Sequence, residues 1–398
     1  MKDGSAQGQP GKGPRRKERL SVALVRQSHS DVGGAEQAVR SITRALGALD
    51  AEVRVSVIAR NWPVTDGIEV LNCDAPASGR AQRDRQFRDC ACTTVERGGF
   101  DLVQSHERIP CCDIYRAGDG VHREWLIQRG RVSGPLRRLA TRLSDFHRQL
   151  LKAERVLYAS PRLKAVICNS HMVAGELQAH YGVSPDKVHV IHNAVDGDRF
   201  HPRLRAEHRE AVLRKYAIGA DEDVALFLGS GYERKGLKAV LEALALLVGE
   251  VPAAPRLLVV GKDSRMGRYQ RLARRLGVED RVVFAGAQPD PRPYLGAADM
   301  LVFPTLYDPF PNVVMEAMAC ALPVITSDKC GATDIIDEGR NGLVCDALDI
   351  PTIARHMHTL LDPQRRDAIG RAARATVEPM NHEAMGKRLM ALYADVLK

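Results

Sequence analysis

The sequence predicts an α/β protein with two doubly wound, Rossmann-like domains that face a central cleft. Short apolar runs of strand length alternate with helical patterns along most of the 398 residues. The alternation stops once, at the Pro- and charge-rich stretch "HNAVDGDRFHPRLR", and then starts again. Glycine-containing loops follow several of the apolar runs, and ligands of parallel sheets bind at such loops. We therefore expect the functional site between the two domains.

The first half begins with residues 1–18, whose Gly, Pro, Gln and charged side chains predict a disordered tail. An N-terminal domain is expected over residues 19–195. Its first unit is the strand "LSVALV", the loop "RQSHSDVGGAEQ", the helix "AVRSITRALGAL" and the strand "EVRVSVIA". Further strands are predicted at "FDLVQSH", "KAVICNS" and "KVHVIHN".

The second half repeats this architecture, and a C-terminal domain is expected over residues 196–378. Strands are predicted at "DVALFLGSG", "RLLVVGK", "RVVFAG", "ADMLVFPT" and "LPVITS", with helices such as "GLKAVLEALALLVGE" between them. Residues 379–398 form an amphipathic helix with no strand after it. We expect this helix to cross back to the N-terminal domain.

Composition limits the classes of protein to consider. No apolar run approaches the roughly 18 residues of a membrane span, and no apolar core follows the basic N-terminus. We therefore expect neither a transmembrane helix nor a signal peptide. The nine cysteines contain no CxxC, which favours reduced cytosolic thiols over a disulfide framework or a zinc site.

The net charge of +9 is unevenly distributed. Residues 122–164 carry eleven Lys/Arg and three Asp/Glu, and their segment "LRRLATRLSDFHRQLLKAERVLYA" spaces leucines at helical intervals. Aromatic residues make up only 5% of the chain, which argues against nucleic acid as a partner. The basic segment favours an anionic membrane surface or an anionic acceptor. A solvated charged face is the alternative.

The stretch "DPFPNVVMEAMACALPVI" follows a predicted strand and places two acids around a helix start. Pro311 is expected at the first helical position. The first amides of such a helix lack intrahelical partners and can bind a phosphate. Asp308 lies before this anion site and Glu316 lies one turn past it. The amides belong to Asn312, Val313 and Val314.

Carboxylates on either side of a phosphate site are poor phosphate ligands but good acceptors for sugar hydroxyls. A diphosphate that joins two sugars needs such acceptors on both sides. The alternative is that both acids only stabilise the helix start, by about 0.3–1 kcal/mol each.

Two further loops carry glycines next to strands. In "LFLGSGYERKG", Gly229 and a second glycine end a strand, and Arg234 and Lys235 could stabilise the charge of a leaving diphosphate. A dinucleotide fingerprint would need glycine where Arg234 stands. The alternative is a solvated cation pair. In "SDVGGAEQAVR", Gly33 and Gly34 allow close approach to a ligand, or simply form a tight turn.

Together these loops resemble the retaining nucleotide-sugar glycosyltransferases of family 4, which have the GT-B fold. The resemblance runs from about residue 20 to the C-terminus. It rests on "GGAE", "HNAVD", "ERKG", "DPFPNVVMEAMACALPVI" and "GRNGLV". Asp308 stands where the family has Glu, which leaves the choice of donor sugar open, and Ala321 stands where the family usually has Gly.

Within this family, "IPCCDIYRAGDGVHREWL" and the Arg-rich segment after it are similar to the lipopolysaccharide core glucosyltransferases. The resemblance implies transfer of a hexose, most readily glucose, from a UDP-sugar to a sugar of the lipopolysaccharide core. It implies retention at the anomeric carbon, with the leaving phosphate taking the acceptor proton. It also implies that no metal or other cofactor is needed, and a cytoplasmic location at the inner face of the bacterial plasma membrane.

The resemblance also implies a role for each site residue. Asp308 would contact the donor sugar, Glu316 the ribose, and Asp113 would work on the acceptor side. An alternative for Asp113 is a structural pair with a nearby arginine. The diphosphate would be held by Gly34, Arg234, Lys235 and the amides of Val313 and Val314.

Other functions remain open at this point. The chain could be a family 4 transferase for another glycolipid or for a small acceptor. From other classes, it could be an NAD(P)-dependent oxidoreductase or a non-catalytic nucleotide-sugar-binding protein.

Overall fold

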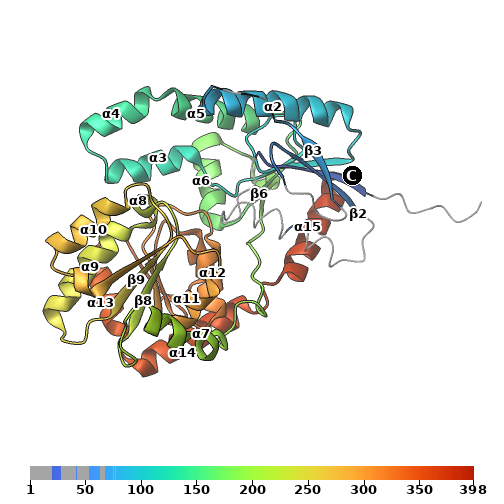
Figure 1. The fold of residues 1–398 in the computed structure, drawn as a ribbon. Helices are drawn as coiled ribbons and strands as arrows, with labels where there is room; N and C mark the ends of the chain where they lie inside the picture. Colours follow the sequence, from blue (N-terminus) through green and yellow to red (C-terminus); the bar gives the residue numbers. More distant parts are fainter. Residues whose placement is uncertain (1–19, 28–41, 43–52, 63–67, 75, 77) are drawn as a thin grey trace, which may run out of the picture.

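The computed structural model describes residues 20–27, 42, 53–62, 68–74, 76 and 78–398. Two parallel sheets form two lobes (Figure 1), which confirms the predicted α/β architecture. The N-terminal sheet has the order β3 (Glu69–Asn72), β2 (Val53–Ala59), β1 (Leu20–Val25), β4 (Leu102–Ser105), β5 (Ile114–Arg116), β6 (Ala165–Cys168) and β7 (Val188–Val190). The C-terminal sheet has the order β10 (Val282–Gly286), β9 (Arg256–Val260), β8 (Val224–Leu228), β11 (Met300–Phe303), β12 (Val324–Ser327) and β13 (Leu343–Cys345).

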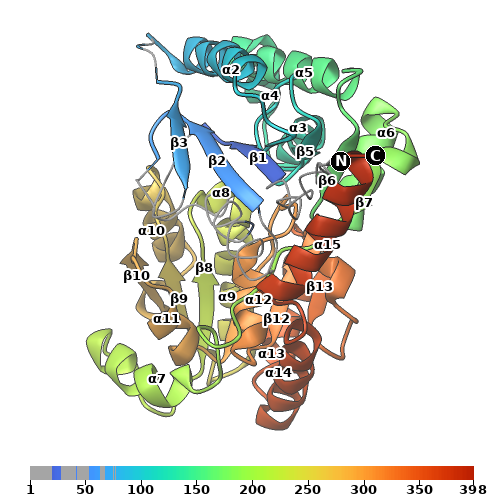
Figure 2. The ribbon, with the colours of Figure 1, turned by 90° about the vertical axis from the view of Figure 1, so that its right-hand side faces the viewer.

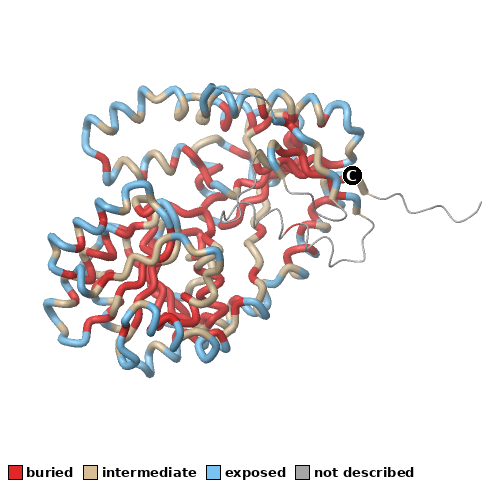
Figure 3. Tube along the Cα trace, viewed as in Figure 1, coloured by how far each residue is buried: buried red, intermediate tan, exposed pale blue. Residues whose placement is uncertain are grey.

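Helices cover both faces of each sheet, so the strands are apolar on both sides (Figure 3). The helices of the N-terminal lobe are α2 (Arg80–Arg97), α3 (His122–Arg131), α4 (Pro135–Leu143), α5 (Asp145–Tyr158) and α6 (His171–Tyr181). In the C-terminal lobe they are α7 (Leu204–Lys215), α8 (Tyr232–Lys235), α9 (Leu237–Glu250), α10 (Met266–Arg275), α11 (Arg292–Ala297), α12 (Asn312–Ala319), α13 (Ile350–Thr359) and α14 (Pro363–Val377). The short 3-10 helices are η1 (Pro185–Lys187), η2 (Glu279–Arg281) and η3 (Gly331–Ile335).

The last helix, α15 (His382–Val396), lies beside the N-terminal sheet (Figure 2). Its residues Met385, Leu389 and Tyr393 belong to the same apolar core as β1 and β2. The Tyr393 hydroxyl donates to Oε1 of Gln104 in β4 over 2.8 Å. The chain therefore ends in the lobe where it began.

Three strands were not predicted: β3, β5 and β13. Each has only three or four residues, and β3 is partly exposed. Short strands without a clear apolar alternation give little periodicity to detect. The missed β5 matters most, because it lies between Asp113 and Asp119 and places these two acids at opposite ends of one strand.

The expectation of reduced thiols is wrong for four of the nine cysteines. Disulfides join Cys73 to Cys90 and Cys92 to Cys111, with Cα–Cα distances of 5.7 and 5.6 Å. Both bonds begin or end in α2, which lies over the sheet and brings together cysteines 17 and 19 residues apart. Linear spacing alone does not reveal this pairing.

No helix within the described ranges is long and apolar enough to cross a membrane.

Candidate functional site

The loop between β11 and α12 holds the start of α12 at the edge of the C-terminal sheet. The helix begins at Asn312 with Pro311 as its N-cap residue, one position later than predicted. Nδ2 of Asn193 donates to Oδ1 of Asn312 over 2.8 Å. We expected the amide of Val314 to bind an anion. It already donates to the Pro311 carbonyl over 3.2 Å, so it is not available for this contact. In the described part of the chain, the amide of Val313 makes no hydrogen bond.

Glu316 lies one turn into α12 and is buried. Burial raises the pKa of Glu316 to about 7, while the positive charge of Arg199 acts in the opposite direction. The carboxyl group therefore gains or loses its proton near neutral pH. An ionised carboxylate in this position can accept two hydroxyl hydrogen bonds.

Lys235 and Asp308 form an ion pair between the end of α8 and the loop before α12. The backbone of Asp308 is fixed, because its N–H donates to the Lys329 carbonyl over 2.9 Å and its carbonyl accepts from Gly331 over 2.8 Å. Burial lowers the pKa of Lys235, and the neighbouring Asp308 offsets part of this effect. The structure thus pairs two residues to which the family resemblance gave separate roles: Lys235 as a diphosphate contact and Asp308 as a donor-sugar contact.

Arg234 is anchored to the same loop. Its Nε donates to the Tyr307 carbonyl over 2.8 Å, and its guanidinium lies 5.7 Å from the ring of Trp125 in the N-terminal lobe. The turn before α8 contains Gly229, whose φ of 154° is unusual for other residues. Gly236 has a φ of 85°, and a Cβ there would lie 2.0 Å from the Pro304 carbonyl oxygen. The "ERKG" segment is therefore packed directly against the loop that carries Asp308.

Asp119 lies in the N-terminal lobe, just past the carboxyl end of β5, and is close enough to Arg234 to be affected by its charge. Its Oδ2 lies 3.8 Å from Arg26 and 4.0 Å from Arg108. Partial burial alone would raise the pKa of Asp119, but Arg26, Arg108 and Arg234 outweigh it and lower the pKa. An ionised carboxylate of the N-terminal lobe is therefore near Arg234 of the C-terminal lobe.

Asp113 occupies the other end of β5. Its Oδ2 accepts from the Val103 amide over 2.9 Å, and its Oδ1 lies 3.3 Å from Nε of Arg162. These contacts place Asp113 at the amino edge of the sheet, away from Arg234 and Lys235. The observed contacts are those of the structural alternative, a pair with an arginine, and they do not support the expected acceptor-side role. Asp119 was missed because β5 was not recognised as a strand.

The predicted Gly33 and Gly34 lie outside the described residues.

Polar contacts connect the lobes beside the site. The Tyr307 hydroxyl accepts from the Val121 amide over 2.8 Å and donates to Oε2 of Glu176 over 2.7 Å. Lys329 lies 3.2 Å from Glu124 and 3.6 Å from Glu176. Burial and the nearby Glu124 raise the pKa of Glu176 to about 7, although the hydrogen bond from Tyr307 and the charge of Lys329 act in the opposite direction. The acids come from the N-terminal lobe and the Tyr and Lys from the C-terminal lobe.

Helices α3 and α4 reach over the C-terminal lobe toward α8 (Figure 1). Arg137 of α4 makes two hydrogen bonds of 2.8 Å to the carboxylate of Glu233 in α8. A cavity of about 560 Å³ lies among α3, α4 and α5, and no carboxylate of the described chain lines it. Its arginines are Arg123, Arg129, Arg131, Arg138, Arg142 and Arg148.

The two lobes match two family descriptions. Residues 32–199 match "Glycosyltransferase Family 4", and residues 222–363 match "Glycosyl transferases group 1". The chain is 30% identical over 387 residues to a D-inositol 3-phosphate glycosyltransferase 2 of Catenulispora acidiphila, covering 89% of this chain and 88% of that protein. It is 24% identical over 325 residues to the lipopolysaccharide glucosyltransferase WaaG of Escherichia coli K12, covering 82% and 85%.

Solved structures show the same fold. A crystal structure of WaaG matches with a TM-score of 0.78 and 22% identity, covering 94% of this chain and 99% of that one. Anabaena Alr3699/HepE in complex with UDP-glucose matches with a TM-score of 0.70 and 19% identity, covering 94% and 100%. Both likenesses extend over the two lobes.

Proposed function

Because this chain belongs to glycosyltransferase family 4 and has the GT-B fold, we propose that it transfers a hexose from a UDP-sugar with retention at the anomeric carbon. The observation that carries the proposal is the convergence of Arg234, Lys235, Asp308 and the start of α12 at one edge of the C-terminal sheet. Family membership removes the support for an NAD(P)-dependent oxidoreductase.

The donor diphosphate would lie between the cations and the helix start. Arg234, Lys235 and the Val313 amide would stabilise the negative charge that develops as the sugar–phosphate bond breaks. Asp308, once Lys235 turns to the diphosphate, would accept a hydroxyl of the donor sugar. Glu316 would accept the ribose hydroxyls. The complex of Alr3699/HepE with UDP-glucose supports a uridine donor for this fold.

The acceptor would enter from the N-terminal lobe. Asp119 lies across from Arg234 and is ionised, so it can accept a hydrogen bond from a sugar hydroxyl on that side. We assign proton removal to the leaving phosphate, which departs on the face where the acceptor oxygen arrives. The new glycosidic bond then forms on the same face, and the acceptor proton ends on the UDP that is released.

We propose a sugar of the lipopolysaccharide core as the acceptor, at an anionic membrane surface on the cytoplasmic side. The arginine-lined cavity supports an anionic partner. Leu136, Leu139 and Leu143 of α4 are exposed beside it, which supports contact with lipid.

A second acceptor class is a small phosphorylated polyol. It is favoured by the relative that is 30% identical and is named for D-inositol 3-phosphate. The same cavity would suit the phosphate of such an acceptor. The two acceptors share anionic character and differ in whether a membrane is needed.

The test is an NMR time course with UDP-glucose and each acceptor in separate reactions. The proposal predicts that the first product has the α-configuration of the donor, and that core oligosaccharide on vesicles reacts at least tenfold faster than D-inositol 3-phosphate. An inverted first product would refute retention. If only D-inositol 3-phosphate reacted, a small phosphorylated polyol would replace the lipopolysaccharide core as the proposed acceptor.

A further inference from the structure

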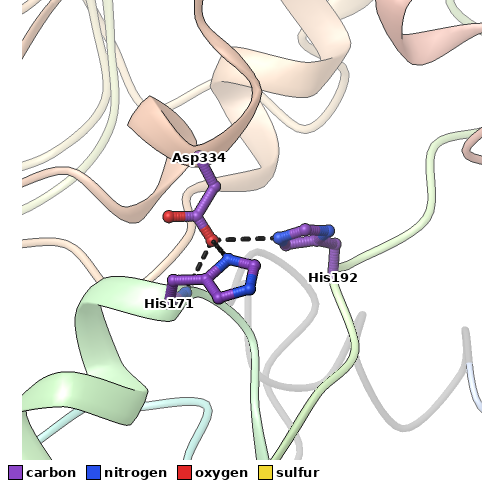
Figure 4. A group of neighbouring side chains, drawn as sticks. All are labelled: His171, His192 and Asp334. Carbon is purple, nitrogen blue, oxygen red and sulfur yellow. Dashed lines mark hydrogen bonds and ion pairs between the residues drawn. The ribbon is translucent and has the colours of Figure 1, made fainter.

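Three side chains of types that can bind metals meet where the two lobes join, next to Phe310 in the loop that carries Asp308. His171 is the first residue of α6, His192 follows β7, and Asp334 belongs to η3 (Figure 4). Nδ1 of His171 and Nε2 of His192 each lie 3.0 Å from Oδ2 of Asp334. One ligand atom from each residue lies within 4.8 Å of the others.

The contacts of Asp334 are concentrated on a single oxygen. Besides the two imidazoles, the His171 amide donates to the same Oδ2 over 2.6 Å. Among the described residues, the other oxygen of this carboxylate, Oδ1, accepts no hydrogen bond. The Asp334 side chain is 8% exposed and that of His192 is 16% exposed. The carboxylate of Asp334 and the ring of His192 are thus mostly enclosed, whereas the ring of His171 lies on the solvent side.

The two nitrogen–oxygen spacings match those between neighbouring ligands in the inner shell of a transition metal. Two ligands at about 2.0–2.1 Å from Zn²⁺ lie about 2.9–3.4 Å apart at angles between 90° and 109°. The observed 3.0 Å contacts fall in this range. Each imidazole would offer its lone pair by carrying its proton on the other ring nitrogen. Two nitrogens and one carboxylate oxygen are ligands that Zn²⁺ and Co²⁺ accept.

We propose that His171, His192 and Asp334 bind one Zn²⁺, or the chemically similar Co²⁺, at the junction of the lobes. The His171 side chain is 74% exposed, which gives the ion an entry path and leaves coordination positions for water. The bound ion would join α6 and the segment after β7 to η3, and so would tie the N-terminal lobe to the C-terminal one.

The metal would not take part in the sugar transfer. The ring of His192 is stacked on Phe310 with centroids 5.1 Å apart, so the site adjoins the loop before α12, but Arg234, Lys235 and Asp308 are not among its three ligands. We therefore assign the ion a structural role and still expect the sugar transfer itself to need no metal.

The test uses metal-stripped, tag-free protein titrated with Co²⁺ while the visible d–d absorption is recorded, followed by displacement with Zn²⁺. We expect one equivalent to bind, the absorption to disappear on adding Zn²⁺, and Zn²⁺ to raise the melting temperature. Asp334→Asn and His171→Ala should each weaken binding at least tenfold. His358→Ala, which changes an exposed histidine of α13, should bind like the parent.

The result that would overturn the proposal is an absent cobalt spectrum, or binding that His171→Ala leaves unchanged. His171→Ala removes an exposed side chain, so the variant is expected to fold. Circular dichroism of each variant without metal checks this.

Discussion

Lys235 and Asp308 neutralise each other across the donor half of the site. Each would have to leave the other to contact a diphosphate and a sugar hydroxyl. The pair keeps a buried cation and a buried carboxylate compensated until the donor arrives. Donor binding would therefore exchange one ion pair for two ligand contacts.

Lys235→Ala is expected to lower kcat about 10²–10³-fold, because it removes a cation that faces the leaving diphosphate. Asp308→Asn should lower kcat/KM and relax the choice of donor sugar. Initial rates over a range of concentrations of UDP-glucose and of other UDP-sugars measure both effects. Lys238→Ala, which changes an exposed lysine of α9, is the matched control and should retain the parent rate. Parent-like rates for Lys235→Ala would remove Lys235 from the mechanism.

The affinity for UDP-glucose should fall as the pH decreases from about 8 to 6. Burial raises the pKa of Glu316 to about 7, so the group is ionised above this pH and becomes protonated below it. The protonated form accepts hydroxyl hydrogen bonds less well. Calorimetric titrations at several pH values measure this, and the dissociation constant should rise by up to about tenfold per unit below the pKa.

Glu316→Gln provides the control for this pH dependence. The amide side chain cannot ionise. The dissociation constant of the variant for UDP-glucose should therefore be larger than that of the parent at pH 8 and nearly constant with pH. A variant that keeps the full pH dependence would show that another group causes it.

Asp119 and Asp113 should respond differently to the same substitution. Asp119→Asn should lower kcat/KM about 10–100-fold with little change in stability, because the carboxylate faces the reacting groups. Asp113→Asn should leave the rate intact and lower the free energy of unfolding by about 1–3 kcal/mol, because it weakens contacts to Val103 and Arg162. Rate assays and urea unfolding of both proteins separate the two roles. The reverse pattern would restore Asp113 to the site.

Replacing Leu136, Leu139 and Leu143 together by Ser should reduce binding to anionic vesicles by more than tenfold. These three side chains are exposed on α4, so the change costs little stability but removes apolar surface that would enter the lipid. Vesicle co-sedimentation measures the effect. Leu246→Ser on α9 removes an exposed leucine from the other lobe and should bind like the parent. Equal binding by the triple variant would exclude α4 as the membrane contact.

The sequence predicted most of the strands because parallel strands buried on both faces are read directly as apolar runs. It also located the "ERKG" and "DPFPNVVMEAM" loops, since glycines, cations and a helix start leave local signals. The Lys235–Asp308 pair could not be predicted, because it joins residues 73 positions apart through the packing of α8 against the loop.

The N-terminal lobe was predicted less well for a similar reason. Choosing between Asp113 and Asp119 requires knowing that a three-residue strand, β5, lies between them. The disulfides and the cluster of His171, His192 and Asp334 likewise depend on distant segments that meet only in the fold. None of these relationships leaves a local pattern.

The most direct test of the central claim is calorimetric titration of the protein with UDP-glucose, UDP-galactose, UDP-N-acetylglucosamine, GDP-mannose and NAD. We expect one UDP-sugar to bind and Glu316→Ala to abolish this binding, while NAD gives no heat. Binding of NAD alone, or UDP-sugar binding that Glu316→Ala does not change, would contradict the assignment of the donor site to α12.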